Sequence, residues 1–396
     1  MVPKDWNPVY LNDIADKIMV GIASAATHAY ADNGIRMLRN LNIKEGFIDD
    51  SDILFVNEEY ELQHKNKRLK AGDILTVRTG YPGLSAVVPK KYDNAQCFTS
   101  LITRLKEDVA LPDYICRFIN SEYGKKYISS GEAGGAQKNV NASILKKMLI
   151  PLPPLSEQRK IAKILSTWDK AISTTERLIE NSKQQKKALM QQLLTGKKRL
   201  LDDSGKPFEG AWEEVKLSKV ADAVMGSSPK SSSYNESSEG LPLIQGNADI
   251  KNRKSAPRIY TSEVTKKCSV GDILLSVRAP VGTIAKSEHV ACIGRGISAI
   301  SAKKHHVQEY LYQWLLWFEP RWEKYSQGST FEAVNSNDIK SLYLIVPTYT
   351  EQAKIASVLS NADQEIELLE QQLADLKQEK KALMQQLLTG KKRVKI

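Results

Sequence analysis

Apolar side chains recur at alternating steps of three and four residues along two long stretches of this chain. The positions are Ile161, Leu165, Trp168, Ile172, Thr175, Ile179, Ser182, Lys186, Leu189 and Leu193 in the first stretch, and Ile355, Leu359, Ala362, Ile366, Leu369, Leu373, Leu376, Lys380, Leu383 and Leu387 in the second. An apolar period of 3.5 residues held this long is typical of a coiled-coil seam. Each stretch therefore predicts a helix of roughly 40 residues, about 60 Å long.

Both stretches close on the same fourteen residues, KKALMQQLLTGKKR, from Lys186 to Arg199 and again from Lys380 to Arg393. An identical repeat of this length indicates a duplicated unit. In each copy a Thr-Gly step stops the helix, and Lys and Arg lie near the negative end of the helix dipole.

Two related helices in one chain predict an intramolecular antiparallel pair, because a two-fold axis across the helices reverses their direction. The alternative is that each helix packs elsewhere, for example against the helices of a partner. Lys186 and Lys380 lie on the polar part of the seam. They have two equally plausible roles, which are setting the register of the coil and binding a partner.

The segments outside these helices mix strand-like and helix-like patterns. In the first we predict a capped helix start at 12–15, strands over 34–40 and 72–78, a helix over 111–127 and a flexible loop at 131–135. Pro151 to Pro154 should break helix and sheet alike, and Ser156-Glu157-Gln158 should then cap the first long helix.

The second half repeats this order with different loops. Its counterparts are 217–221, 240–244, 271–278 and 307–318, with Val277-Arg278 answering Val77-Arg78 and Glu351-Gln352 answering Glu157-Gln158. Residues 65–70 and 227–238 have no counterpart in the other half. A duplicated scaffold whose two domains carry different loops indicates a protein that recognises two different targets at a fixed separation.

The resulting fold class is α+β, with two α/β domains separated by two long helices in a pseudo-two-fold repeat. The predicted segments are residues 1–150 (first domain), 151–200 (first helix), 201–346 (second domain) and 347–396 (second helix).

Composition narrows the choice of partners. The 396 residues are 41% hydrophobic and 26% charged, which is ordinary for a globular protein, while the net charge of +11 favours a polyanionic partner. No apolar run is long enough to cross a membrane, and the first residues lack a signal-peptide core. The four cysteines show no CxxC spacing, so we expect free thiols in the cytoplasm and no metal.

One combination of motifs resembles a known family. Pro-Leu-Pro-Pro-Leu-Ser-Glu-Gln-Arg-Lys-Ile-Ala from Pro151, its weaker copy from Val346 to Ala356, the Leu-Leu-Thr-Gly endings and the Gly-Asp-Ile-Leu strands are similar to the specificity subunit of type I restriction–modification complexes. The resemblance covers the whole chain. The second copy departs from it at Pro347-Thr348-Tyr349, where the first has Pro153-Pro154-Leu155.

The resemblance implies a specific function. Such subunits recognise a bipartite sequence in double-stranded DNA, each domain contacting one half-site, while the coil sets the gap between the half-sites. Two adenine-N6 methyltransferase subunits dock on the helices, and ATP-driven restriction subunits join them. The catalytic chemistry belongs to these partners, so we expect no cofactor in this chain.

The sequence itself offers little catalytic chemistry. Asn7-Pro8-Val9-Tyr10 differs by one letter from the NPPY loop of adenine methyltransferases, but no glycine-rich cofactor-binding turn precedes it. There is no phosphate-binding GxxxxGK[ST] loop, and the five histidines show no metal-ligand spacing.

Residues for DNA contact are chosen by side-chain chemistry, since Arg and Lys neutralise phosphates and Arg, Asn or Gln pair with base edges. The candidates are Arg36, Arg39, Lys65, Lys67, Arg68 and Arg78 in the first domain, and Lys230, Tyr234, Gln245, Asn247, Arg253, Arg258 and Arg278 in the second. For any one of them, an ordinary solvated surface role is the alternative.

The repeated helix ends are candidates for partner binding through Lys197, Lys198, Lys391 and Lys392. Two identical copies would each meet one copy of the same partner, although recent duplication or gene conversion also explains their identity. Two other functions compete with DNA recognition: a stand-alone nucleic-acid enzyme, and a coiled-coil adaptor that never touches DNA. Missing catalytic motifs argue against the first, and the excess positive charge argues against the second.

Overall fold

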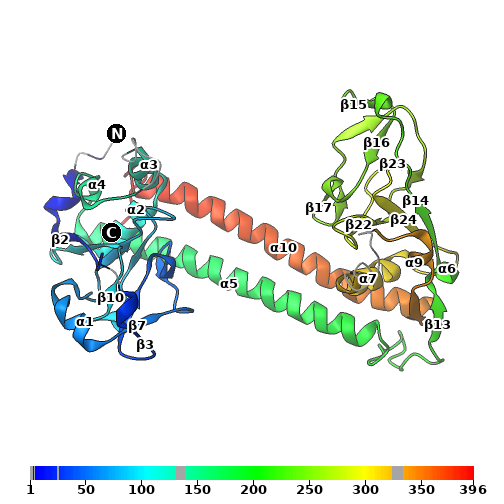
Figure 1. The fold of residues 1–396 in the computed structure, drawn as a ribbon, viewed down its shortest axis with the longest axis horizontal. Coiled ribbons are helices and arrows are strands. Elements are labelled where there is room, and N and C mark those ends of the chain that lie inside the picture. Colours follow the sequence, from blue (N-terminus) through cyan, green and yellow to red (C-terminus); the bar gives the residue numbers. More distant parts are fainter. Residues whose placement is uncertain (1–2, 4, 25, 131–138, 323–332) are drawn as a thin grey trace. The chain divides into compact units, whose positions relative to one another are not determined.

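The computed structural model describes residues 3, 5–24, 26–130, 139–322 and 333–396. Its contacts form two compact units, one of residues 1–175 with 372–396 and the other of residues 176–371. Each unit holds one α/β domain, called here the first and the second domain, the beginning of one long helix and the end of the other (Figure 1). The long helices are α5 (Leu155–Leu193) and α10 (Tyr349–Leu387).

The first domain is built on two four-stranded sheets, ordered β10-β4-β7-β3 and β2-β11-β8-β9. Their strands are β3 (Tyr30–Ala31), β4 (Ile35–Leu38), β7 (Leu54–Val56) and β10 (Gln96–Cys97), and β2 (Ala15–Val20), β8 (Ile74–Thr76), β9 (Ser85–Val87) and β11 (Leu101–Leu105). Two ribbons pair β1 (Asn7–Tyr10) with β12 (Leu149–Leu152) and β5 (Ile43–Lys44) with β6 (Phe47–Ile48). The helices are α1 (Glu58–Gln63), α2 (Pro112–Asn120), α3 (Glu122–Ser130) and α4 (Ala142–Lys146).

The second domain repeats this plan with a six-stranded sheet, β14-β24-β21-β22-β18-β17, and a five-stranded sheet, β15-β19-β16-β23-β20. The strands of the first sheet are β14 (Ala221–Met225), β17 (Ile250–Lys251), β18 (Lys254–Ser255), β21 (Ile273–Ser276), β22 (Ile284–Lys286) and β24 (Ile297–Ala302). Those of the second are β15 (Tyr234–Asn235), β16 (Leu241–Ile244), β19 (Ile259–Thr261), β20 (Lys267–Cys268) and β23 (Ala291–Ile293). A ribbon joins β13 (Glu213–Lys216) to β25 (Tyr343–Val346), and the helices are α6 (Leu217–Val220), α7 (Gln308–Phe318) and α9 (Ser336–Lys340).

The two domains share their strand pairing. The sheet segment β2-β11-β8-β9 corresponds to β14-β24-β21-β22, and in both domains the central strands run antiparallel. In the other sheet, β4 lies parallel to β10 as β16 lies parallel to β23. The internal duplication predicted from the sequence is therefore a duplication of topology.

Of the local predictions for the first domain, one was wrong and one was incomplete. In place of the capped helix start at 12–15, residues 11–13 form a single 3₁₀ turn, and the chain then enters β2 at Ala15, where it pairs with β11. The helix over 111–127 is two helices that meet at Ser121, whose hydroxyl donates to the carbonyl of Phe118. The predicted strands at 34–40 and 72–78 are confirmed as β4 and β8, while the loop at 131–135 lies outside the described residues.

The prolines before the first long helix do not exclude a strand, contrary to our prediction. Pro151 lies within β12, directly opposite Pro8 in β1. A ribbon of two strands tolerates prolines because each strand has an edge whose N–H groups need no partner. The helix then begins at Leu155.

The two long helices are antiparallel partners, as predicted. In the first unit Asp169 pairs with Lys380 at 2.6 Å, and Glu157 pairs with Arg393 at 2.6 Å. In the second unit Lys186 pairs with Asp363 at 2.5 Å, and Arg199 with Glu351 at 2.6 Å. In each unit, residues further along the α5 stretch pair with residues earlier in the α10 stretch, so the two helices run antiparallel there. Every predicted seam position is buried or half-buried.

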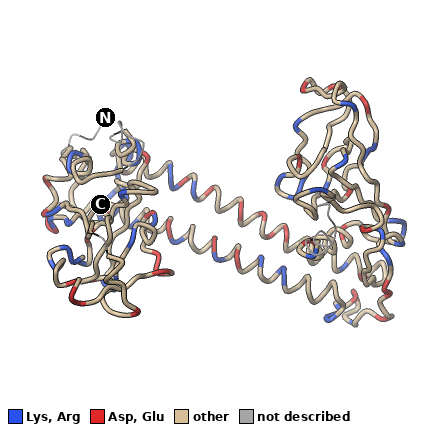
Figure 2. Tube along the Cα trace, in the orientation of Figure 1, with Lys and Arg blue, Asp and Glu red and all other residues tan. Residues whose placement is uncertain are grey.

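The two seam lysines have the same kind of partner. Lys186 and Lys380 each form an ion pair with an aspartate of the opposite helix, and these aspartates, Asp363 and Asp169, are themselves equivalent in the repeat. Outside the seam, charges of both signs follow one another along α5 and α10 (Figure 2). The pairing supports a role of these lysines in setting the register.

Each domain core includes the ends of both helices. In the first unit Ile161 of α5 and Leu387 of α10 belong to the same buried cluster as Phe118 of α2. In the second unit Leu193 and Ile355 join Trp314 of α7 in the equivalent cluster. The ends of the long helices are thus part of the domain cores.

Candidate nucleic-acid interface

A polar pocket of about 160 Å³ opens on the second domain where four connections meet. These are the connection after β14, the turn after β16, the end of β21 and the connection between β23 and β24. The pocket is lined by Ser228, Gln245, Gly246, Asn247, Ser276, Arg278, Ala279, Arg295 and Gly296. It therefore brings together three residues predicted from the sequence, Gln245, Asn247 and Arg278, with one that was missed, Arg295.

The two arginines of this pocket are exposed. Among the described residues, none forms a hydrogen bond or ion pair with either guanidinium group. Their backbones are held in place, since Ser276 Oγ donates to the carbonyl of Arg278 at 3.0 Å and the Arg295 N–H donates to Ser228 Oγ at 3.2 Å. Two cations that no described residue neutralises can bind a polyanion without first breaking an ion pair with those residues.

The close approach of two of these connections depends on a glycine. A Cβ atom at Gly296 would lie 2.3 Å from the carbonyl oxygen of Gln245, so no other residue fits there without a backbone shift. The sequence signal for this feature is the Gly-Arg-Gly step at 294–296. Arg295 was not among the residues predicted from the sequence.

Gln245 is oriented by a chain of hydrogen bonds. The Tyr234 hydroxyl donates to the carbonyl of Pro229 at 3.2 Å and accepts from Gln245 Nε2 at 3.0 Å. This fixes the amide with its nitrogen toward Tyr234 and leaves Oε1 as an acceptor. Tyr234 was predicted to contact DNA, which stays a prediction; in the structure its hydroxyl holds the amide of Gln245.

The equivalent place in the first domain is filled by its own side chains. Asn40 Nδ2 donates to Thr79 Oγ1 at 2.9 Å and to Thr99 Oγ1 at 3.4 Å. Asn40 Oδ1 accepts from Ser100 Oγ at 2.8 Å. The donor Nδ2 and the acceptor Oδ1 of this amide therefore both have hydrogen-bond partners inside the protein.

Backbone hydrogen bonds establish which residues correspond. Gly83 N–H donates to Val77 O as Gly282 N–H donates to Ser276 O, so Arg78 corresponds to Val277. The sequence match of Val77-Arg78 to Val277-Arg278 is therefore wrong by one position, and Arg278 corresponds to Thr79. Likewise, the three residues between β10 and β11 have Thr99 in the middle, and those between β23 and β24 have Arg295.

Four other candidate arginines are paired with carboxylates. The pairs are Arg39–Asp52 at 2.6 Å, Arg68–Glu61 at 2.5 Å, Arg253–Glu319 at 2.7 Å and Arg258–Asp249 at 2.8 Å. The hydrogen bond from Arg68 holds the pKa of the buried Glu61 carboxyl below its ordinary value. These arginines have evident structural partners, and a DNA phosphate would have to compete for them.

The remaining candidates differ in availability. Arg36 donates to the Lys91 carbonyl at 2.9 Å, Lys67 to the Gly21 carbonyl at 2.9 Å and Arg78 to the Val140 carbonyl at 3.2 Å. These bonds leave the charges unneutralised. Lys65 and Lys230 are exposed.

The repeated helix ends show why their sequence is shared. Arg199 Nε and Nη2 contact the two carboxylate oxygens of Glu351 at 3.0 and 2.6 Å, and Trp212 Nε1 donates to the same carboxylate at 3.1 Å. In the first unit Arg393, Glu157 and Trp6 make the same arrangement. Both glutamates are fully buried, so each repeat ends in an arginine that neutralises a carboxylate at the start of the other helix.

The lysines beside these arginines remain exposed. Lys197, Lys198, Lys391 and Lys392 lie just after Gly196 and Gly390, whose positive φ angles of 69° and 72° end the helices. No described residue forms an ion pair with any of these four side chains. They stay available to a partner.

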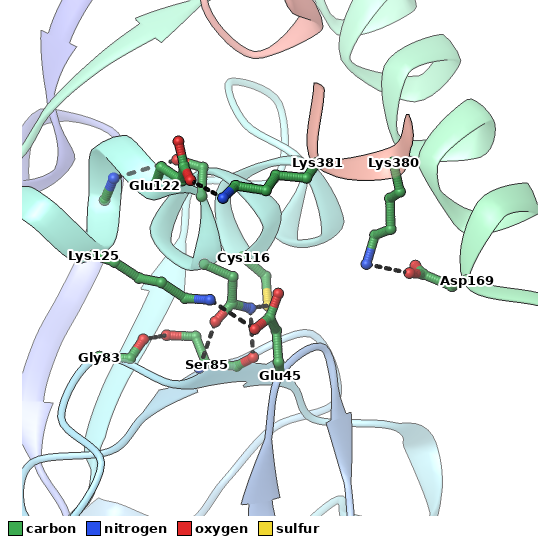
Figure 3. A network of polar contacts seen from close by, with 12 residues as sticks. Glu45, Gly83, Ser85, Cys116, Glu122, Lys125, Asp169, Lys380 and Lys381 are labelled. Atoms are coloured by element: carbon green, nitrogen blue, oxygen red, sulfur yellow. Dashed lines mark hydrogen bonds and ion pairs between the residues drawn. The ribbon is translucent and has the colours of Figure 1, made fainter. Parts of the chain in front are cut away.

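The end of α10 is also tied to the first domain through polar contacts (Figure 3). Lys381 pairs with Glu122 at 2.5 Å, and Lys380 with Asp169, which also accepts from Arg117 at 2.6 Å. Burial by itself would raise the pKa of Asp169, but the hydrogen bonds from Lys380 and Arg117 outweigh it and the pKa lies below its ordinary value. This network fastens a helix to a domain and contains no free nucleophile.

The sequence features considered for catalysis and metal binding have ordinary structural positions in the described parts of the chain. Asn7–Tyr10 is strand β1 rather than a loop. All four cysteines are buried free thiols, and burial raises the pKa of Cys97 and of Cys116 to about 12. Across these residues there is no cluster of potential metal ligands, and no helix has the length and apolar character that a membrane span requires.

Comparison with known proteins gives one consistent result. Residues 3–183 and 209–378 match the family model described as type I restriction modification DNA specificity domain. The chain is 32% identical to the putative type I restriction enzyme MjaX specificity subunit of Methanocaldococcus jannaschii, with 100% of this chain and 95% of that protein covered. It is 24% identical to the MjaVIII specificity subunit of the same organism, with 100% and 94% covered.

Two solved structures are similar over almost the whole length. One, from work on complex assembly and conformational transition of the type I R-M system, has a TM-score of 0.65 and 26% identity, with 98% of both chains covered. The other, the HsdS subunit from Thermoanaerobacter tengcongensis, has a TM-score of 0.53 and 25% identity, again with 98% of both chains covered.

Proposed function

Because this chain belongs to the family of type I restriction–modification specificity subunits, we propose that it is the non-catalytic subunit through which such a complex recognises its DNA sequence. Each domain contacts one half of a bipartite target. The methyltransferase and endonuclease activities lie in other subunits.

One observation supports bipartite recognition above all. The two domains share strand order and backbone pairing, yet the same place in the fold is filled by Asn40, Thr79 and Thr99 in one and lined by Arg278 and Arg295 in the other. A common frame with different polar side chains suits two half-sites of different sequence. An adaptor that never touches DNA would have no use for this difference.

The partners follow from the same proposal. They are double-stranded DNA, two methyltransferase subunits and ATP-dependent restriction subunits. The exposed lysine pairs 197–198 and 391–392 have equivalent positions in the two units, which is what two copies of one methyltransferase subunit require. Arg199 and Arg393, which pair with buried glutamates, explain part of the identity of the repeats without a partner. The exposed lysines do not share that constraint.

Methylome sequencing of cells that carry this chain with its methyltransferase subunits tests the proposal. We expect a single bipartite motif with a methylated adenine in each half-site and a gap of fixed length. Replacing residues 1–150 with the equivalent domain of a relative should change one half-site only. A complex without a bipartite motif, or a replacement that alters both half-sites, would contradict modular recognition.

Charge reversal tests the docking surface separately. Lys197→Glu with Lys198→Glu should reduce co-purification of the methyltransferase subunit to about one copy per chain. The same changes at Lys391 and Lys392 should remove the other copy, and the control Lys251→Glu with Lys267→Glu should retain both. Unchanged stoichiometry in the first two variants would show that the lysines do not dock this partner.

A further inference from the structure

The pocket of the second domain contains both donors and acceptors. Arg278 and Arg295 are donors only, whereas the fixed amide of Gln245 presents Oε1 as an acceptor. The amide of Asn247 also lines the pocket, and no described residue forms a hydrogen bond with it. A site for a phosphate group needs donors alone, because phosphate oxygens accept.

This combination matches the edge of a guanine–cytosine pair in the major groove. Guanine presents the acceptors O6 and N7, to which arginine donates two hydrogen bonds, and the paired cytosine presents the N4–H₂ donor. A carboxamide oxygen can accept that hydrogen bond. An adenine–thymine pair also presents two acceptors and one donor, but its donor lies between the acceptors, so one arginine cannot donate to both acceptors as it does on guanine.

In the first domain the same place in the frame is closed by hydrogen bonds between its own side chains. There Asn40 opens a 3₁₀ helix as Asn247 does, and its amide is satisfied by Thr79, Thr99 and Ser100. In the second domain arginines stand in the places of both threonines. Arg278 and Arg295 therefore replace internal hydrogen-bond partners with charges that face solvent.

We infer that Arg278, Arg295 and Gln245 determine specificity for one guanine–cytosine pair in the half-site of the second domain, and that the equivalent place in the first domain contacts no base. The inference rests on the proposed function and adds to it the base pair and the residues that select it. Tyr234 acts as a positioning residue by holding the amide of Gln245.

The first domain itself supplies the test variant. The double variant Arg278→Thr with Arg295→Thr gives the second domain the two threonines that the first domain has at the equivalent positions, Thr79 and Thr99. The pocket then keeps polar side chains but loses both positive charges. The full chain with its methyltransferase subunits would be bound to an oligonucleotide pool randomised in both half-sites, at several salt concentrations. At one position of the second half-site we expect preference for guanine–cytosine to fall by roughly 5- to 150-fold, the range of one bidentate base contact. The first half-site should stay unchanged.

Three controls decide between the explanations. Lys251→Thr with Lys267→Thr removes the same charge from exposed positions outside the pocket and should leave all base preferences intact. Tyr234→Phe should weaken the same preference less than the double arginine variant does. Asn40→Ala in the first domain should change no base preference.

Two results would overturn the inference. Equal weakening on all sequences with a shallower salt dependence would identify the arginines as phosphate contacts. Full retention of both half-sites would show that the pocket does not contact DNA. In either case a wild-type complex that selects a bipartite sequence keeps the proposed function, whereas a wild-type complex without such selection would remove both.

Discussion

Arg199 and Glu351 form a two-bond ion pair that fastens the end of one long helix to the start of the other within the second unit. The glutamate is fully buried, so its charge depends on this arginine and on the Trp212 indole. Arg393 and Glu157 repeat the arrangement in the first unit. The arginine shared by the two helix ends therefore has a physical basis in two equivalent buried carboxylates.

Arg199→Ala should destabilise the second unit by about 3 kcal/mol, because removing one partner leaves a buried charge without its counterion. Hydrogen exchange should rise at the start of α10 and stay unchanged at the start of α5. Arg393→Ala should give the opposite pattern, and Lys198→Ala, at an exposed neighbour, should change neither. Equal hydrogen exchange at both helix starts in either variant would argue against two ion pairs that act independently in the two units.

The Lys186–Asp363 pair should show measurable coupling in a double-mutant cycle of Lys186→Met and Asp363→Asn. We expect about 1 kcal/mol, since the lysine side chain is only 11% exposed. The pair Lys183–Glu370 in the same unit, 51% exposed on both sides, supplies the matched control and should couple by less than about 0.5 kcal/mol. Equal coupling in the two pairs would refute a special role for the seam lysine.

Acid should weaken the attachment of α10 to the first domain through Asp169. The folded-state pKa of this carboxyl lies below the ordinary value of 3.8, so its contribution to stability is present above that value and is lost as pH falls through the folded-state pKa. Wild type should exceed Asp169→Asn in unfolding free energy by a constant amount between about pH 5 and 7. The difference should shrink below the ordinary pKa, and urea titrations across this range would detect a constant gap if the assignment is wrong.

The coil should act as a ruler for the gap between half-sites. Because the helices are antiparallel, four residues must be added to both, after Thr175 and after Leu373, and a coiled coil accommodates such a four-residue stutter. The addition lengthens each helix by about 6 Å and turns its face by about 40°, while DNA rises about 3.4 Å per base pair along each strand. We expect a gap longer by one or two base pairs with unchanged half-sites.

Methylome sequencing would measure that gap directly. A four-residue insertion between Gly205 and Lys206, in an exposed turn outside the helices, should leave it unchanged. An active protein with the original gap after the helix insertions would leave the coil as a docking surface only.

The sequence by itself determined the features that depend on periodicity and repetition. Long seams such as that from Ile161 to Leu193 have one stable solution, which is to bury their apolar stripe against a like helix. The duplication made an antiparallel pair the natural arrangement, and the family was recognisable from the Pro-Leu-Pro-Pro and Leu-Leu-Thr-Gly motifs. These signals are local in the chain and carry their own geometry.

Only the tertiary structure decided what depends on residues far apart in the chain. The helix start predicted at 12–15 is a 3₁₀ turn that leads into β2 at Ala15, and β2 pairs with β11, which lies far away in the chain. The candidate arginines became distinguishable because Arg39, Arg68, Arg253 and Arg258 meet carboxylates, whereas Arg278 and Arg295 meet solvent. No pattern in the sequence contains this information, since the free energy of a charged side chain is set by the groups that folding places beside it.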